Sequence, residues 1–394
     1  MKTKDSRLFC LIISFTLIFC LCLCTSFNQV QAYDQTIQSR AALLMEAHAG
    51  EIIFAHNEHE KLFPASVTKI MTLLLALEAL ETGEIGLEDE VPVSGNAASF
   101  GGSTLFLSQG DIVDLESLLI GITVGSGNDA AVAVAEYMAG SEEAFVERMN
   151  KRALELGMKN TNFVNCTGLH HDDHYTTAYD VALLSREIVK YPRFFNWSKI
   201  WMDENFLEGK IKSEKVYLSN TNRLIRSYQG CDGIKTGFTN ESGHSISASA
   251  LRGETRFIAV VLNAPSSDIR YEEAVNLLNY GFANYSNIPL AGKKEVVARL
   301  AVEKGTLREV DVVTSDILCL LVKKGEEPHY TTEIVLPESL EAPLSLEEKV
   351  GKMRVMEGET VLKEVDLEVS QEVKRASLPQ LFRRYMEIWL KFGR

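Results

Sequence analysis

Residues 62–72 read LFPASVTKIMT and open a strongly apolar helical pattern. Pro64 suits the start of a helix, because the first helical position needs no backbone N–H donor. Apolar side chains then continue to Leu80 and wrap nearly all round, which predicts a buried helix. Ser66 would lie at its start and Lys69 one turn later on the same face, about 5–6 Å apart at Cβ. A lysine on so apolar a helix is costly unless it has a partner.

Ser66 and Lys69 are the residue types of an activated nucleophile and its base. A serine hydroxyl reacts poorly until a neighbouring group removes its proton. Lysine can do so where burial and nearby cations lower its pKa. Ser-x-x-Lys is a weak pattern when it stands alone, and the alternative is a helix-capping serine followed by a solvated lysine. The interpretation therefore depends on further motifs.

Two short motifs can complete such a site. Ser126-Gly127-Asn128 joins predicted helices at 114–124 and 129–138, where a loop can aim a hydroxyl and an amide into a cleft. Lys235-Thr236-Gly237 enters a predicted strand, where the lysine and hydroxyl could hold a carboxylate and the glycine would let substrate approach closely. Ser94-Gly95-Asn96 also matches Ser-x-Asn, but it lies in a loop segment instead of between two helices.

The rest of the chain predicts two folded parts. Residues 33–287 mix helical and strand patterns, including a hairpin within 41–56 and paired strands within 243–263, which indicates an α+β domain with an antiparallel sheet. Residues 288–374 alternate in short runs between turns, typical of a small all-β domain. A length of 394 residues, 46% of them hydrophobic, is ample for this organisation.

Both ends of the chain have membrane-related patterns. Residues 1–32 combine three early cationic residues, an apolar run and the small-x-small sequence Val30-Gln31-Ala32, which predicts a secretory signal peptide, with an uncleaved anchor as the alternative. Residues 375–394 predict an amphipathic helix with basic residues opposite an apolar stripe, which favours binding to a membrane surface over docking on the protein itself. The stripe consists of Leu378, Leu381, Phe382, Tyr385, Ile388, Trp389 and Phe392.

The charge and the cysteines argue against a nucleic-acid-binding protein and against a metal site. The net charge is −14 and no cluster of Lys and Arg is present, so nucleic acid is not an expected partner. Beyond residue 32, Cys166, Cys231 and Cys319 lack metal-like spacing; buried free thiols are expected, with a Cys166–Cys231 disulfide as the alternative. The run 170–174 holds three His and two Asp, but adjacent ligands in a loop make poor geometry. No metal or cofactor is predicted.

The three motifs together resemble those of penicillin-binding proteins and serine β-lactamases. Longer segments are similar to low-molecular-mass D-alanyl-D-alanine carboxypeptidases: 62–72 (LFPASVTKIMT), 101–107 (GGSTLFL), 125–134 (GSGNDAAVAV), 174–185 (HYTTAYDVALLS) and 232–239 (DGIKTGFT). The likeness covers nearly the whole chain after residue 32. It implies a transpeptidase-like α+β catalytic domain, then a small β-sandwich domain and an amphipathic helix.

The resemblance implies roles for the first two motifs. Ser66 resembles the acylated nucleophile and Lys69 its general base. Ser126 resembles the proton relay, and Asn128 the residue that contacts the substrate amide. Ser66, Lys69 and Ser126 would therefore carry the chemistry, and Asn128 would bind the substrate.

The resemblance also implies how substrate is held. Lys235 and Thr236 match the pair that attracts and binds the substrate carboxylate, with Gly237 beside them. The backbone N–H of Phe238, with that of the nucleophile, matches an oxyanion hole. Arg270 occupies the place of a carboxylate-binding arginine. Arg223 stays unassigned, because its register differs from the family pattern.

The implied function is that of an extracytoplasmic serine carboxypeptidase that removes the terminal D-alanine from peptidoglycan stem pentapeptides. β-Lactams mimic D-Ala-D-Ala and should acylate Ser66. A β-lactamase is the nearest alternative, but the Glu-x-x-Leu-Asn string often found in that class is absent between Asn128 and Lys235. A non-catalytic receptor for penicillin or wall peptide is the other alternative, and the complete set of motifs argues against it.

Overall fold

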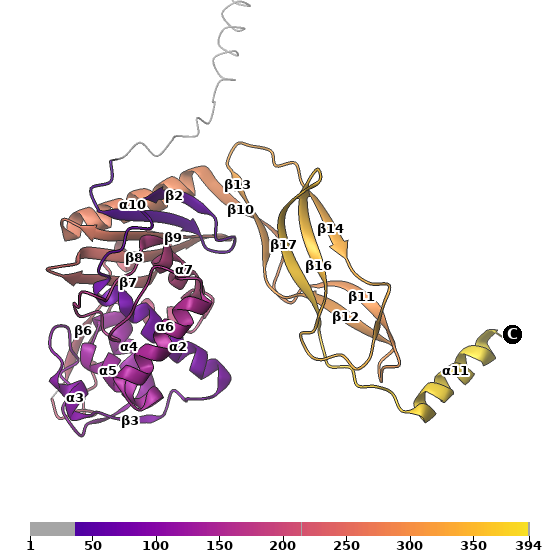
Figure 1. Cartoon of the computed structure of the whole chain (residues 1–394), viewed down its shortest axis with the longest axis horizontal. Helices are drawn as coiled ribbons and strands as arrows, with labels where there is room; N and C mark the ends of the chain where they lie inside the picture. Colours follow the sequence, from indigo (N-terminus) through magenta and orange to yellow (C-terminus); the bar gives the residue numbers. More distant parts are fainter. Residues whose placement is uncertain (1–35, 214, 393–394) are drawn as a thin grey trace, which may run out of the picture.

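The computed structural model describes residues 36–213 and 215–392, and Figure 1 shows two folded parts followed by a helix. The predicted signal peptide, residues 1–32, lies outside the described residues. The first part contains an antiparallel five-stranded sheet that confirms the α+β prediction. Its order is β2 (Ile52–His56), β1 (Ala41–Glu46), β9 (Thr255–Ala264), β8 (Gly243–Arg252) and β7 (Cys231–Thr239).

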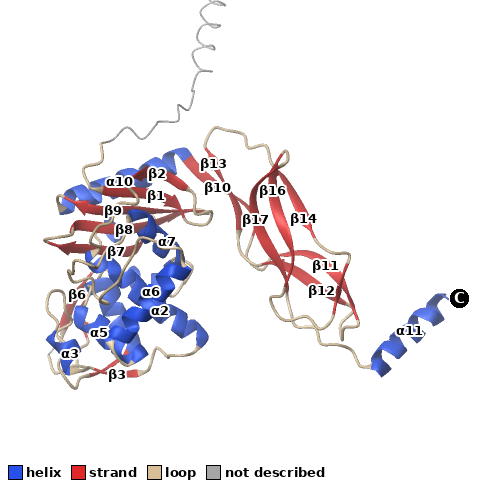
Figure 2. Cartoon of the chain, viewed as in Figure 1, coloured by secondary structure: helices blue, strands red, loops and turns tan. Residues whose placement is uncertain are grey.

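Both faces of this sheet are covered, because its strands are apolar on both sides. In β1, Leu43 and Met45 join the core on one face, while Ala42 and Leu44 join the core on the other. Helix α10 (Ser267–Asn284) packs on the second face against β8 and β9. The other long helices of this part lie on the first face (Figure 2).

The helical region on the first face surrounds α2 (Lys69–Thr82), which is buried as its all-round apolar pattern predicts. Its other long helices are α5 (Asn128–Ala139), α6 (Glu142–Glu155) and α7 (Ala178–Ile188). Shorter elements are α3 (Gly95–Ser99), α4 (Leu115–Ile120), α8 (Phe194–Ser198), α9 (Leu224–Ser227), and the strand pairs β3 (Glu90–Pro92) with β4 (Ile112–Asp114) and β5 (Met202–Phe206) with β6 (Val216–Ser219).

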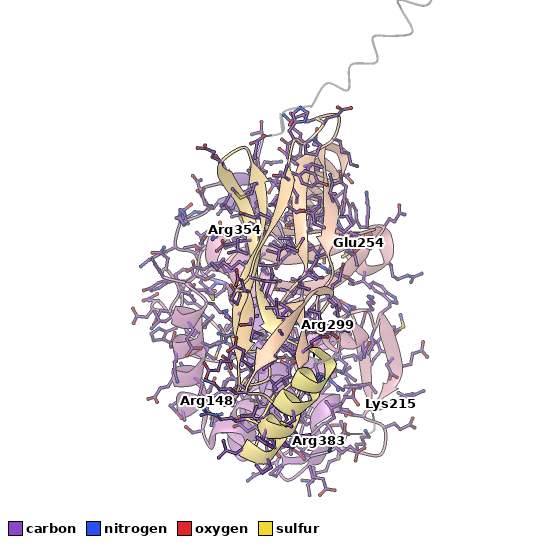
Figure 3. The ribbon with its side chains drawn as sticks, turned by 90° about the vertical axis from the view of Figure 1, so that its right-hand side faces the viewer. Arg148, Lys215, Glu254, Arg299, Arg354 and Arg383 are labelled. Atoms are coloured by element: carbon purple, nitrogen blue, oxygen red, sulfur yellow. The ribbon has the colours of Figure 1, made fainter. Side chains whose placement is uncertain are left out.

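The β domain is built on two sheets. Strand β10 (Tyr285–Ala291) pairs with β13 (Leu318–Lys323). A six-stranded sheet has the order β14 (Thr331–Val335), β16 (Lys349–Glu357), β17 (Thr360–Val369), β12 (Glu309–Thr314), β11 (Val296–Glu303), β15 (Ser339–Glu341). Figure 3 looks onto this domain and labels Arg299 on β11 and Arg354 on β16. Arg299 pairs with the directly opposite Asp311, and Arg354 with the directly opposite Glu364.

The described chain ends in α11 (Leu378–Phe392), in line with the predicted helix. Arg384 donates to the backbone oxygens of Gly305 (2.8 Å) and Thr306 (2.7 Å) in the β domain. On this helix Leu378 is 82% exposed and Phe382 is 69% exposed. Within the described residues, no helix combines the length and apolarity needed to cross a membrane.

The three cysteines of the described chain are buried free thiols, as expected from their number and spacing. Burial raises the pKa of Cys231 to about 12 and that of Cys319 to about 11. Burial also raises the pKa of Cys166 well above its ordinary value. The alternative Cys166–Cys231 disulfide is not formed.

Candidate active site

Ser66 lies in a tight turn that precedes the buried helix. The α-helix predicted to open at Pro64 begins instead at Lys69, and residues Ala65–Thr68 form a 3₁₀ turn. Ala65 has φ +48°, a left-handed conformation that is unfavourable for a residue with a side chain. Such strain persists only where surrounding contacts hold it, and it gathers at functional sites. The turn leaves Ser66 partly exposed while its neighbours Ala65, Val67 and Thr68 are buried.

Lys69 is fully buried and contacts Ser66 directly. Its Nζ lies 3.1 Å from Ser66 Oγ, 2.6 Å from Asn128 Oδ1 and 2.7 Å from the Thr167 carbonyl oxygen. Burial lowers the pKa of Lys69 to about 7, although the acidic groups of Cys166 and Asp129 act in the opposite direction. A neutral amine has two N–H donors. The two carbonyl oxygens can take both, which leaves the nitrogen lone pair facing the Ser66 hydroxyl.

The second motif connects a π-helical turn, η2 (Gly121–Gly125), to α5. Ser126 adopts φ +64°, and its buried Oγ has no hydrogen-bond partner among the described residues. Asn128 accepts from Lys69 through Oδ1 and donates through Nδ2 to the Gly101 carbonyl oxygen at 2.7 Å. The amide predicted to contact substrate is therefore engaged here with Lys69 and with the loop at 101–107.

Asp129 holds that loop in place, a role that the sequence interpretation missed. Its buried carboxylate accepts from the backbone N–H of Leu105 (2.9 Å) and Leu107 (3.1 Å). The residue between them, Phe106, is 66% exposed and has φ +57°. The available signal was an acidic residue in the first turn of an otherwise apolar helix, where an unpartnered carboxylate is costly.

The third motif lies on β7, the edge strand of the sheet, directly behind the Ser66 turn. A Cβ added to Gly237 would lie 2.9 Å from the Pro64 carbonyl oxygen and 3.0 Å from Ser66 N. The glycine was predicted to admit substrate, but in the structure its missing side chain makes room for the Ser66 turn. Thr236 Oγ1 donates to Thr221 Oγ1 at 2.9 Å.

Lys235 adds a second buried amine to the site. Burial, together with the cations Lys69 and Arg270, holds the pKa of Lys235 well below its ordinary value. An arriving carboxylate favours the charged form of the amine, so an anionic substrate would raise this pKa. Arg270 donates from Nη1 to the Gly237 carbonyl oxygen at 3.4 Å, which places its guanidinium against the same strand.

Phe238 follows Gly237 on the strand, and its half-exposed ring stacks on His244 at 4.3 Å. Because Ser66 N lies against Gly237, the backbone of Phe238 is adjacent to the backbone N–H of Ser66. All nine residues predicted for the site therefore belong to the Ser66 turn and the first residue of α2, to the loop before α5 and the first residue of α5, or to β7 and the arginine that contacts it.

The competing sequence features have structural roles. Ser94 is the N-cap of α3 and accepts from the backbone N–H of Ala97 at 2.9 Å. In the run 170–174, His170 packs edge-on against Phe63, and His174 is buried beside Thr68. Across the described ranges, no group of three or more His, Cys, Asp or Glu is arranged to hold a metal ion.

A serine beside a buried lysine, backed by the edge strand of an antiparallel sheet, defines the site of a serine acyl-transfer enzyme. The family model described as D-alanyl-D-alanine carboxypeptidase matches residues 28–266, and the one described as Penicillin-binding protein 5, C-terminal domain matches residues 285–375. The chain belongs to the D-alanyl-D-alanine carboxypeptidase family of serine peptidases.

Individual relatives are similar over most of the chain. D-alanyl-D-alanine carboxypeptidase DacF of Bacillus subtilis (strain 168) is 39% identical over 356 residues, 90% of this chain and 91% of the relative. Penicillin-binding protein 5 of Haemophilus influenzae superposes with a TM-score of 0.69 at 28% identity, over 88% of this chain and 100% of that one. Penicillin-binding protein D2 of Listeria monocytogenes, in its ampicillin-bound form, matches 63% of this chain and 99% of its own, with a TM-score of 0.56 and 28% identity.

Proposed function

We propose that Ser66 is the nucleophile with which this D-alanyl-D-alanine carboxypeptidase removes the terminal D-alanine of a peptidoglycan stem peptide. The observation that carries the proposal is the 3.1 Å contact between Ser66 Oγ and Lys69 Nζ. The other two partners of this amine are carbonyl oxygens. With its pKa near 7, Lys69 has a large neutral fraction at neutral pH and can accept the serine proton.

The reaction proceeds in two halves. Ser66 Oγ attacks the carbonyl carbon between the two D-alanines while its proton passes to Lys69. The N–H groups of Ser66 and Phe238 stabilise the oxyanion, and Ser126 relays the proton held by Lys69 to the departing D-alanine nitrogen, which leaves the Lys69 amine neutral for the second half. Water then attacks the ester, and its proton returns through Lys69, which releases the shortened peptide and free Ser66.

Substrate binding uses the cationic side of the site. Lys235 attracts the terminal carboxylate and Thr236 donates a hydrogen bond to it, with Arg270 adding positive charge behind β7. Asn128 contacts the substrate amide while its Oδ1 stays on Lys69. β-Lactams, which carry a comparable carboxylate and a reactive amide, acylate the same serine, in keeping with the ampicillin-bound relative.

Mass spectrometry of the intact protein tests the assignment. Incubation with penicillin should add one adduct, and Ser66→Ala should abolish it. Release of D-alanine from a D-Ala-D-Ala pentapeptide should disappear in the same variant. An adduct that survives in Ser66→Ala overturns the assignment, and one lost only in Ser94→Ala would move it to the competing motif. Rapid turnover of penicillin would favour the β-lactamase alternative.

We further propose that the enzyme is exported by residues 1–32 and held at the outer face of the cytoplasmic membrane by residues 375–394. Two features of α11 support this. Leu378 and Phe382 are largely exposed, while Arg384 attaches the helix to the β domain. Exposed apolar side chains beside basic residues suit an interface with anionic lipids. The division into a catalytic domain at 33–287 and a β domain at 288–374 belongs to the same proposal.

A further inference from the structure

The segment 162–176 lies along the residues that carry the nucleophile and its base. Backbone hydrogen bonds in both directions join Leu62 and Thr176, at 2.8 and 2.9 Å. Lys69 donates to the Thr167 carbonyl oxygen (2.7 Å) and Thr72 to the Cys166 carbonyl oxygen (2.8 Å). Gly168 packs closely on the Ala65 carbonyl. A Cβ on Gly168 would lie 1.8 Å from the Ala65 oxygen. The segment therefore forms one wall of the active site.

His174 joins the two ends of this wall to the nucleophile turn. Its ring is 1% exposed, and both of its nitrogens are hydrogen-bonded. The backbone N–H of Val164 donates to Nδ1 at 3.2 Å, and Nε2 lies 2.8 Å from Thr68 Oγ1. Because Nδ1 is an acceptor, the proton of the neutral ring resides on Nε2 and is donated to Thr68.

The surroundings of His174 keep the ring neutral. Burial is the main cause that lowers its pKa to about 4, and Coulomb interactions with His171, His170 and Lys69 act in the same direction. Near pH 7 the ring is thus one donor and one acceptor, which matches its two partners. A protonated ring would instead direct an N–H toward the N–H of Val164.

We propose that His174 is a positioning residue for acylation, which fixes Thr68 against the wall that supplies the Thr167 carbonyl. Thr68 ends the turn that carries Ser66 and directly precedes Lys69. The His174 ring therefore fixes the position of the turn relative to the wall, so that the Lys69 lone pair faces Ser66 Oγ. The inference rests on the proposed roles of Ser66 and Lys69.

Glutamine and asparagine at position 174 separate the two hydrogen bonds. The amide nitrogen of glutamine reaches the place of Nε2 and can donate to Thr68. The amide oxygen of asparagine reaches only the place of Nδ1 and can accept from Val164. His174→Gln should therefore retain the bond to the nucleophile turn, whereas His174→Asn should lose it.

The test measures acylation of the full chain by a fluorescent penicillin over a range of concentrations, which separates the maximal rate from the apparent affinity. His174→Ala and His174→Asn should lower the maximal rate about tenfold or more and change the affinity less than about twofold, because only positioning is lost. His174→Gln should stay within about threefold of the parent rate. His171→Ala, an exposed histidine of the same segment, is the matched control and should not change it.

A partner variant completes the design. Thr68→Val should slow acylation as His174→Ala does, and the double variant should be no slower than either single one. Parental rates in His174→Ala overturn the inference. If the Gln and Asn variants slow acylation equally, and in proportion to their lowered melting temperatures, His174 has only a structural role and the inference is overturned. If His174→Ala does not fold, the Gln and Asn pair decides. Failure of the proposed function is recognised separately, by an adduct that persists in Ser66→Ala.

Discussion

Acylation should titrate with the Lys69 amine, at a pH far below that of ordinary lysine. An amine with the ordinary pKa of 10.5 would be neutral in about one molecule in 3,000 at pH 7, whereas a pKa of about 7 makes about half of the molecules neutral. The difference between the two values corresponds to about 5 kcal/mol, and its main cause is burial of the charged form. Below pH 6 the neutral fraction, and with it the rate, should fall about tenfold per pH unit.

The measurement is the second-order rate constant for acylation by a fluorescent penicillin between pH 4.5 and pH 9.5. The parent should show a rising limb with a midpoint near pH 7 and then a plateau. Lys69→Arg should abolish the reaction, because a guanidinium stays charged and cannot accept the proton. A rate that is constant from pH 5 to pH 9, or near-parental acylation by Lys69→Arg, would refute the assignment of this amine as the base.

Three further outcomes follow from packing, burial and exposure. Gly237→Ala should destabilise the protein by about 1–3 kcal/mol and slow acylation, because its Cβ would meet backbone atoms at 2.9–3.0 Å. The control is Gly292→Ala, whose Cβ would meet only a flexible side chain; it should change neither the melting temperature nor the acylation rate. The folded-state pKa of His174 is below its unfolded value, so the unfolded chain binds more protons between pH 4 and 6.5 and stability must fall as pH falls through that window. Between pH 6.5 and pH 4 the free energy of unfolding, measured by denaturant titration, should fall by about 3 kcal/mol. His174→Gln should remove much of this pH dependence. Deletion of residues 377–394 should release the enzyme from anionic liposomes and leave its activity on a soluble peptide intact; continued binding or lost activity would make α11 a structural element.

The parts of the site that could be predicted are those in which residue type and spacing limit the chemistry. Ser66 with Lys69 is informative because a lysine on an all-apolar helix needs a polar partner, and the structure supplies three. The buried helix and the paired strands followed from periodicity, which is a local property. The family and its activity followed from the order of the three motifs along the chain.

The parts that could not be predicted depend on contacts between segments without periodicity. The Thr167 carbonyl is a backbone group, so no residue type identifies it as a partner of Lys69. The reason for Gly237 is visible only once β7 and the Ser66 turn are side by side. In the β domain, periodicity does not reveal β16, because Gly351 and the charged residues Lys349, Lys352 and Arg354 interrupt its apolar alternation.

The buried thiols have a consequence for how the protein is handled. Thiolate is the reactive form of cysteine, and Cys166, Cys231 and Cys319 all have pKa values raised by burial. Thiol-alkylating reagents and mild thiol oxidants should therefore leave these three cysteines of the folded protein unmodified, and stability should be the same in reducing and oxidising buffers. A cysteine placed on the exposed surface, for instance at Leu378 on α11, would react selectively over these three and could report by fluorescence on the environment of the helix.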